Sequence, residues 1–298
     1  MKALITGDRG FVGGHLQRKL TELGYEVFGF DIKSGDDIRD YEQVRNALDS
    51  IRPDYIYHLA AQAYVAESFT AAARTFEVNT IGSTNLLEAV RQVGIKPCIL
   101  LAGTSEEYGD ATAPTGPTDE GSLPNPLSPY AISKLAMDYM GQLYSRSYGM
   151  RVVVARTFNH TGPGRGEMYA ESAFAKQIVE IEQGRRELLE HGNLEWIRNY
   201  TDVRDIVNAY VQAITLPPGI YNIASDQNIS IKKVLDMLTA EAECDITRTY
   251  NPALHRPSDF SFHPPSCEKF KKLTGWIAQI PLADTLAEIL ADWRERLA

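Results

Sequence analysis

The sequence predicts an α/β fold in which a doubly wound parallel sheet is followed by a smaller, mixed C-terminal lobe. Three observations predict it: β-rich runs alternate with amphipathic helical stretches up to about residue 160, a glycine-rich turn follows the first run, and the alternation weakens afterwards. With 298 residues and 44% hydrophobic content, the chain can bury a substantial core.

Strands and helices are expected to alternate through the first half of the chain. The β-rich runs predict strands over residues 3–6, 26–31, 55–59, 98–102 and 151–155. Apolar residues at helical spacing predict helices over residues 15–23, 41–50, 71–93 and 129–148. Gly24, Gly94 and Gly149 are placed to end three of these helices.

The second half has shorter elements and more loops. One expected element is a helix near residues 173–183, and residues 220–223 look like a buried strand that could return to the main sheet. We therefore divide the chain into a domain of residues 1–160 and a lobe of residues 161–298, parts of which rejoin the first sheet.

The charge and the composition exclude several classes of protein. The net charge is -9, from 39 acidic and 30 basic residues, without the long basic run that nucleic acids or anionic membranes require. No apolar run approaches the roughly 18 residues that span a bilayer, and no leader pattern opens the chain. Neither nucleic acid nor membrane is an expected partner, and an anionic ligand needs locally placed donors.

Cysteine and histidine spacing argues against metal sites and disulfides. Cys98, Cys244 and Cys267 are far apart and form no CxxC motif, which favours a reducing, cytoplasmic location. The six histidines show no paired ligand spacing, so we predict no metal, and His160 is interpreted as a loop residue near a cofactor.

A glycine-rich turn joins the first strand to the first helix. Gly7, Gly10 and Gly13 stand where the backbone must turn tightly and approach a dinucleotide diphosphate, and the helix that follows offers amide donors at Phe11 and Val12. This strand, turn and helix order predicts a Rossmann domain that binds a nicotinamide cofactor.

Asp31 follows the glycine turn by about twenty residues, at the end of the second expected strand. Its carboxylate can accept hydrogen bonds from ribose hydroxyls and would repel a 2′-phosphate, so NAD(H) is favoured. Lys33 nearby leaves NADP(H) possible. Asp37 and Ile38 are expected after a much shortened third strand, where Asp37 could meet adenine; a polar turn is an equally good interpretation.

Tyr130 and Lys134 lie four residues apart at the start of a predicted helix, so their side chains share one face. A phenol is a poor acid–base catalyst at neutral pH, but a neighbouring ammonium and an oxidised nicotinamide both favour its phenolate. Thr104 lies upstream, just after a strand whose carboxyl end should open toward the cofactor. These residues predict hydride transfer assisted by a tyrosine.

The TGxxGFxG, HLAAQ and YxxxK motifs together resemble the extended short-chain dehydrogenase/reductase family along essentially the whole chain. The resemblance implies that Thr104 hydrogen-bonds the reacting oxygen, Tyr130 is the acid–base and Lys134 holds the nicotinamide ribose. It also implies that a loop along the cofactor is formed by Leu59, Ala60, Ala61 and Gln62.

Four further segments, at residues 156–164, 192–194, 198–205 and 256–259, are similar to the GDP-mannose 4,6-dehydratase branch of this family, and most of all to its reductases of GDP-6-deoxy-4-keto-mannose. The implied substrate is a GDP-linked hexose. Its contacts would come from Thr104, Ser105, Glu106, Tyr130, Asn159, Lys176, Asn193, Leu194, Arg198, Arg256 and Asp259. Asn199 and Asp259 depart from residues common in the branch, where an acidic residue and Glu respectively are usual.

The leading hypothesis is reduction of the C4 ketone of GDP-4-dehydro-6-deoxy-D-mannose to GDP-D-rhamnose. Glu106 stands where dehydratases carry the base that removes the sugar C5 proton, so a 4,6-dehydratase or another nucleotide-sugar dehydratase or epimerase is the alternative. A cofactor-binding regulator without turnover is a third reading, since the fold does not dictate the function. The resemblance also implies a homodimer, in which helices 71–93 and 129–148 of two subunits form a four-helix contact.

Overall fold

The computed structural model describes residues 1–109, 116–254 and 264–298 of the chain. Its main sheet has six parallel strands in the order β10-β5-β4-β3-β1-β2. Their bounds are β1 Lys2–Thr6, β2 Glu26–Phe30, β3 Tyr55–His58, β4 Cys98–Thr104, β5 Arg151–Thr157 and β10 Gly219–Ile223. The strand order reverses between β1 and β3, where ligands bind in sheets of this kind.

The five strands predicted for the first half are confirmed, as is the return of residues 220–223, which pair with β5. The prediction of a shortened third strand before Asp37 is wrong. The 3-10 turn η1 (Ile32–Ser34) follows β2 directly, and Asp31 caps it by accepting a hydrogen bond from the Lys33 amide. The Asp37 side chain then binds the amide and guanidinium of Arg39. These local side-chain contacts satisfy backbone and side-chain groups within turns, so the segment does not pair as a strand.

Successive residues of β1 point to opposite faces of the sheet, and each face has its own core. Ala3 and Ile5 pack on the face covered by α1 (Phe11–Glu22), α8 (Val203–Ala213) and α10 (Glu268–Thr274). Leu4 packs on the face covered by α2 (Tyr41–Ile51), α5 (Gly82–Val93) and α6 (Pro129–Tyr148). The sheet is therefore buried on both sides, as a doubly wound fold requires.

The predicted helices are confirmed with changed bounds. α1 begins at Phe11, four residues earlier than expected, because Gly10 already adopts the extended N-cap conformation. The single helix expected over residues 71–93 consists of α4 (Ala72–Phe76), the π-helical segment η2 (Glu77–Ile81) and α5. A short helix, α3 (Val65–Thr70), precedes it and was not predicted. Gly94 and Gly149 are the C-caps of α5 and α6.

A separate core holds the C-terminal lobe together. It lies between α7 (Ala170–Glu182), α9 (Ile231–Ala240) and α11 (Leu282–Leu297), where Ile178, Leu235 and Ile289 are fully buried. Three two-stranded sheets complete the fold. They pair β6 (His160–Thr161) with β9 (Thr201–Asp202), β7 (Leu189–His191) with β12 (Arg248–Tyr250), and β8 (Ile197–Asn199) with β11 (Asn228–Ser230).

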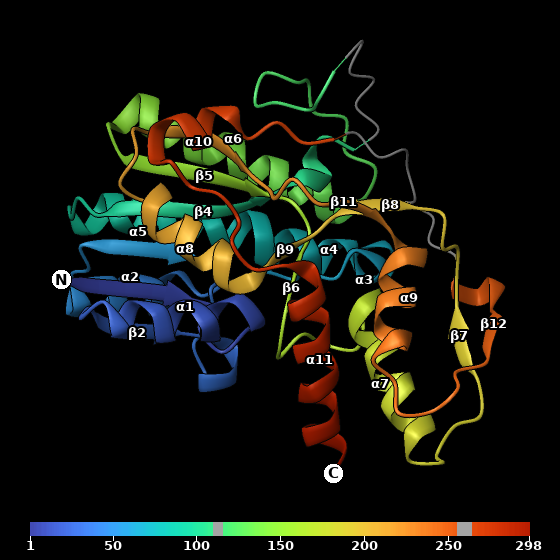
Figure 1. Ribbon diagram of the computed structural model, residues 1–298. Helices are drawn as coiled ribbons and strands as arrows, with labels where there is room; N and C mark the ends of the chain where they lie inside the picture. Colours follow the sequence, from blue (N-terminus) through green and yellow to red (C-terminus); the bar gives the residue numbers. More distant parts are fainter. Residues whose placement is uncertain (110–115, 255–263) are drawn as a thin grey trace.

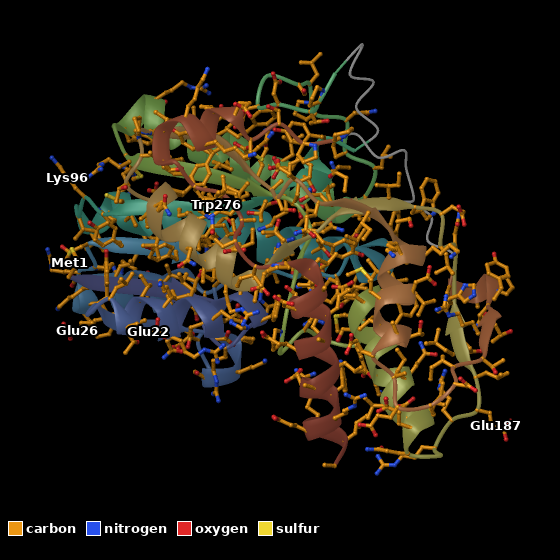
Figure 2. The ribbon with its side chains drawn as sticks, viewed as in Figure 1. Met1, Glu22, Glu26, Lys96, Glu187 and Trp276 are labelled. Carbon is orange, nitrogen blue, oxygen red and sulfur yellow. The ribbon has the colours of Figure 1, made fainter. Side chains whose placement is uncertain are left out.

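The lobe lies beyond the carboxyl ends of the main strands. Figure 1 shows β1 running from the N-terminus toward the side of the molecule where α7, α9 and α11 are packed. In Figure 2, Met1, Glu26 and Lys96 lie at the opposite end of the molecule from Glu187. The space between the strand ends and the lobe is thus bordered by both parts of the chain.

Among the helices of the described residues, none has the length and hydropathy needed to cross a bilayer. α8, α9, α10 and α11 were not predicted individually from the sequence. The division of the chain into a domain of residues 1–160 and a lobe of residues 161–298 stays a prediction.

We expect Leu100→Ala to lower the free energy of unfolding by about 2–5 kcal/mol, because Leu100 is fully buried in the central strand β4 and its removal leaves a cavity. Urea unfolding followed by circular dichroism measures the change. Leu123→Ala is the control, since that side chain is 84% exposed and its loss should shift the free energy by less than about 0.5 kcal/mol. Equal midpoints for the two variants would contradict the packing described above.

Candidate active site

A cleft of about 700 Å³ opens between the sheet and the lobe. The sheet side contributes the glycine turn, the ends of β3 and β4, and the start of α6. Residues 157–160, at and after the end of β5, continue the lining toward the lobe. The lobe contributes residues between Arg165 and Gln177 and residues of β7, β8 and their connections. The volume lies within the range of about 300–1,000 Å³ typical of ligand sites.

Glycines shape the sheet side of the cleft. A Cβ atom on Gly13 would lie 2.1 Å from the Gly7 carbonyl oxygen, and one on Gly7 would lie 2.8 Å from the Ala60 amide nitrogen. Gly7 also has a φ of +77°, which favours glycine. No side chain caps α1 at Gly10, so its first amides remain available to a ligand. A dinucleotide diphosphate fits this cradle, because it needs close backbone approach and helix N-terminal donors.

Asp31 lies beside the glycine turn rather than in the lining of the cleft. Its buried carboxylate accepts hydrogen bonds from the Arg9 amide at 3.1 Å and the Lys33 amide at 2.8 Å. It therefore ties the end of β2 to the turn. Asp37 and Ile38 also lie outside the lining; Ile38 packs against Gly82 of α5.

The loop after β3 runs beside the glycine turn, and Leu59 and Ala61 line the cleft. Asn79, in the π-helical segment, holds this loop in place. Its side chain accepts from the Gln62 amide at 2.8 Å and donates to the Gln62 carbonyl at 3.0 Å and to Ser133 Oγ at 2.9 Å. The loop after β3 and helix α6 are thereby joined through one buried amide, which the sequence did not suggest.

Thr104 ends β4 and begins the 3-10 turn η3 (Ser105–Glu107). A reciprocal capping box fixes this turn: Thr104 Oγ1 accepts from the Glu106 amide, and the Thr104 amide donates to Glu107 Oε1 at 2.9 Å. The turn leaves Thr104 and Glu106 in the lining of the cleft, whereas Ser105 is not part of it.

Tyr130 and Lys134 project into the cleft from the first turns of α6, as the spacing predicted. Ser128 caps the helix by accepting a hydrogen bond from the Ala131 amide at 3.1 Å, and Pro129 begins it. The Thr104 hydroxyl lies near enough to Tyr130 to lower the pKa of the phenol, and both side chains are buried. The expected juxtaposition of these three residues in one cleft is therefore present.

Burial controls the titration of both groups. It raises the pKa of Tyr130 well above the usual value, with further contributions from Tyr169, Glu106 and Glu107 that the nearby Thr104 hydroxyl does not offset. Burial also lowers the pKa of Lys134 to about 8, against a smaller opposite effect of Glu107. The sequence argument favoured a phenolate; in the protein itself Tyr130 is a neutral phenol and can donate a proton.

A buried ion cluster lies beneath Thr104. The Arg156 guanidinium binds Asp138 Oδ2 at 2.6 Å and lies 3.0 Å from Glu107 Oε2, and all three side chains are almost completely inaccessible. Burial and the neighbouring Asp138 raise the pKa of Glu107 to about 8, although Arg156 opposes this. Because Glu107 also accepts from the Thr104 amide, the cluster fixes the position of the Thr104 backbone.

Only some of the substrate residues inferred from the resemblance lie in the lining of the cleft. The cleft lining includes Asn159, Asn193, Leu194 and Arg198, together with Glu106 and His160. Lys176 lies outside the lining and pairs with Glu167 and Glu180. Arg256 and Asp259 lie outside the described residues. Burial lowers the pKa of His160 to about 4, so this residue is neutral.

Two residues near the site were missed from the sequence. Glu106 and Glu107 are adjacent, and no spacing in the sequence indicates which of them has a role in the site. Only the burial of Glu107 in the structure distinguishes the two. Arg165 lines the cleft directly after the glycines of residues 162–164. Its position next to a glycine loop in an acidic chain could have marked it as an anion ligand. Within the described residues, no cluster of three potential metal ligands occurs.

The fold and this cleft define an NAD(P)-dependent nucleotide-sugar oxidoreductase of the extended short-chain dehydrogenase/reductase type. Residues 32–289 match the model of the GDP-mannose 4,6 dehydratase family. The chain belongs to this family.

Known proteins resemble the chain over its full length. The GDP-6-deoxy-D-mannose reductase of Pseudomonas aeruginosa is 31% identical over 299 residues, covering 99% of this chain and 98% of that enzyme. A structure of RMD from Pseudomonas aeruginosa complexed with NADPH superposes with a TM-score of 0.90 at 30% identity, covering 99% of both chains. The Thermus thermophilus UDP-glucose 4-epimerase complex with NAD superposes with a TM-score of 0.87 at 29% identity, covering 99% of both chains.

Turnover is expected to fall as the pH rises through about 8, because Lys134 is an ammonium below its pKa and loses its charge above it. Tyr130 keeps its proton over the same range, since its pKa is raised. The measurement is kcat/KM between about pH 6 and 10, with circular dichroism to verify folding at each pH. A profile that stays flat to the alkaline limit would contradict a requirement for charged Lys134.

Proposed function

We propose that this protein reduces the C4 ketone of a GDP-linked 4-keto-6-deoxy-hexose, converting GDP-4-dehydro-6-deoxy-D-mannose to GDP-D-rhamnose. The observation that carries the proposal is that the Thr104 and Tyr130 side chains are buried together in the lining of a cleft to which the glycine turn and the lobe both contribute. The similarity to the Pseudomonas aeruginosa GDP-6-deoxy-D-mannose reductase supports the choice of substrate.

A bound nicotinamide cofactor supplies the hydride that the ketone carbon receives. Tyr130 donates its phenolic proton to the sugar O4, and its raised pKa keeps that proton in place before the reaction. The Thr104 hydroxyl orients the same oxygen. Lys134 holds the nicotinamide ribose and, as a cation, stabilises the negative charge that Tyr130 carries after it gives up its proton.

Both NADH and NADPH are proposed as cofactors, held by Gly7, Gly10, Gly13 and the first turn of α1. The Asp31 carboxylate favours NADH, because it repels a 2′-phosphate and suits ribose hydroxyls. Two cations beside it, Arg9 and Lys33, reduce this repulsion: Lys33 Nζ donates to the Arg9 carbonyl at 3.0 Å. NADPH is therefore not expected to be rejected outright.

Arg198 is the proposed ligand of the substrate diphosphate on the lobe side, with Asn159, Asn193 and Leu194 beside the sugar and the base. A net charge of -9 gives the protein no general attraction for such a ligand, so a local guanidinium must supply it. Arg256 and Asp259 keep the roles in substrate binding that the family resemblance implies. Lys176 is a weaker candidate for such a role.

A 4,6-dehydratase is the second candidate, and the placement of Glu106 favours it. Glu106 lines the cleft and lies near enough to Tyr130 to raise its pKa. A carboxylate there could remove the C5 proton of GDP-mannose after oxidation at C4. Such a reaction returns the hydride to the sugar and consumes no added NADH.

The two candidates are separated by substrate. Purified protein with NADH or NADPH and enzymatically prepared GDP-4-dehydro-6-deoxy-D-mannose is expected to consume the absorbance of the reduced nicotinamide, and Tyr130→Phe should lower kcat by about 10²–10⁴-fold. Incubation with GDP-mannose alone is expected to give no 4-keto product. Formation of that product, and its loss in Glu106→Gln while ketone reduction persists, would instead establish the dehydratase.

We also propose a cytoplasmic homodimer. The three cysteines are free thiols, as expected in a reducing compartment. On α6, Ile132, Tyr139 and Leu143 recur at helical spacing and are each more than 40% exposed. Ile81, in the neighbouring π-helical segment, is 53% exposed. An exposed apolar stripe of this kind suits a four-helix contact between two subunits.

Tyr139→Arg is expected to convert the dimer to a monomer, because it places a charge in the centre of the apolar stripe. Light scattering coupled to size-exclusion chromatography measures the mass, and circular dichroism verifies that helix content is unchanged. Ile277→Arg is the matched control: Ile277 is 54% exposed but lies outside the stripe, so this variant should remain dimeric. A wild-type protein that elutes as a monomer would remove the proposal.

A further inference from the structure

Asn222 lies on β10, at the edge of the main sheet, and its side chain is completely buried. Its Nδ2 atom donates to two backbone carbonyls, those of Thr118 and Ser266, each at 3.2 Å. Because carbonyl oxygens only accept hydrogen bonds, these contacts fix which way the Asn222 amide points. Its Oδ1 atom therefore faces the Tyr108 hydroxyl, which donates to it at 2.7 Å.

Tyr108 is the C-cap of the turn η3, which begins after Thr104. Its buried ring packs against Phe158 at a centroid distance of 6.4 Å and lies 4.8 Å from the guanidinium carbon of Arg156. Burial raises the pKa of Tyr108 to about 12, so the hydroxyl keeps the proton that it donates. The hydrogen bond to Asn222 thus ties the end of η3 to β10.

Two neighbouring strands hold consecutive residues of this turn. Arg156 on β5 and Asn222 on β10 are register partners in the parallel ladder, so their side chains point to the same face of the sheet. The Arg156 guanidinium lies 3.0 Å from Glu107 Oε2, and Asn222 accepts from the next residue, Tyr108. Because Glu107 accepts from the Thr104 amide, the first contact acts on the start of the turn and the second on its end.

The remaining contacts of Asn222 fix it in place. Thr118, which binds its Nδ2 atom, pairs with a second segment by donating to the Pro264 carbonyl and accepting from the Ser266 amide, both at 2.8 Å. The Asn222 backbone amide donates to Glu120 Oε1 at 2.8 Å. Both the backbone and the side chain of Asn222 are therefore held, and its Oδ1 atom is a fixed acceptor for the turn.

We propose that Tyr108 and Asn222 are positioning residues for the reduction of the ketone. Their hydrogen bond holds the turn from which Thr104 and Glu106 reach the lining of the cleft. Both residues lie behind the turn rather than among the described residues that line the cleft, so they act through it. A misplacement of about 1 Å can cost on the order of 10²-fold in rate. The inference rests on the proposed function in requiring turnover, and it adds two residues to that site.

Tyr108→Phe tests the hydrogen bond, because it removes the hydroxyl and keeps the buried ring. With NADH or NADPH and GDP-4-dehydro-6-deoxy-D-mannose, kcat is expected to fall by about 5- to 50-fold. KM for the nucleotide sugar and the dissociation constant of the cofactor should stay within about twofold, since the contact serves the transition state.

Tyr221→Phe is the matched control. Tyr221 precedes Asn222 on β10, is 3% exposed like Tyr108, and donates to the Pro217 carbonyl at 2.9 Å instead of to the turn. Both tyrosine variants lose one hydroxyl contact, so their melting temperatures should be similar. Tyr221→Phe should keep the wild-type kcat, whereas Tyr108→Phe should not.

A double-variant cycle tests whether the two residues act as one unit. Asn222→Leu removes the acceptor and keeps a side chain of similar size, so it should lower kcat at least as much as Tyr108→Phe. The double variant should lose no more than Asn222→Leu alone, because both substitutions break the same hydrogen bond. If Asn222→Leu does not fold, the comparison of the two tyrosine variants still decides.

Three results would each overturn the inference while the proposed function stands. They are an unchanged kcat in Tyr108→Phe, equal losses of kcat in Tyr108→Phe and Tyr221→Phe, and a Tyr108→Phe protein whose cofactor affinity falls in parallel with kcat. Additive losses in a folded double variant would also reject it. A wild-type protein that does not reduce the ketone would reject the proposed function and this inference together, so the two failures are distinguishable.

Discussion

The burial of Tyr130 beside Thr104 keeps a neutral proton donor at the carboxyl end of β4, and the surrounding structure maintains this arrangement. On one side, the capping box and Glu107 fix the Thr104 backbone above the Arg156 cluster. On the other, Ser128 fixes the first turn of α6, from which Tyr130 projects. A residue on a strand and a residue on a helix can keep one arrangement because local caps fix both of them.

Burial gives these groups their chemistry. In water, a phenol and an ammonium would have their ordinary pKa values, and neither would change its protonation state near neutral pH. Removing them from water raises the pKa of Tyr130 and lowers that of Lys134 to about 8. In the same cleft the Arg165 guanidinium keeps its charge between the rings of Phe11 and Tyr169, with the Glu171 carboxylate 3.8 Å away. The cleft therefore combines a proton donor, Tyr130, with a cation whose charge depends on pH, Lys134, and a cation that stays charged, Arg165.

The fold and the placement of Tyr130 and Lys134 in one cleft could be predicted because they depend on local patterns. A strand, a glycine turn and a helix are contiguous, so the positions of Gly7, Gly10 and Gly13 are sufficient to indicate a dinucleotide site. Tyr130 and Lys134 lie one helical turn apart, which fixes their common face before any tertiary contact forms. Residues 220–223 were identified by their apolar run, and β10 pairs with β5 as expected. The third strand was predicted wrongly, since side-chain contacts of Asp31 and Asp37 with their own segment compete with strand pairing.

The amino-acid order thus determined what neighbours along the chain can specify: the type of each element, the glycine turn, and the face of α6 that carries Tyr130 and Lys134. Three-dimensional packing was needed to select Glu107 rather than Glu106 for burial, to place Lys176 outside the cleft lining, and to bring Arg165 against Phe11. Residues 11 and 165 are remote in sequence, and no periodicity links them. Their contact depends on how the lobe closes against the sheet, because hydrophobic burial in three separate cores sets that arrangement and local propensity does not.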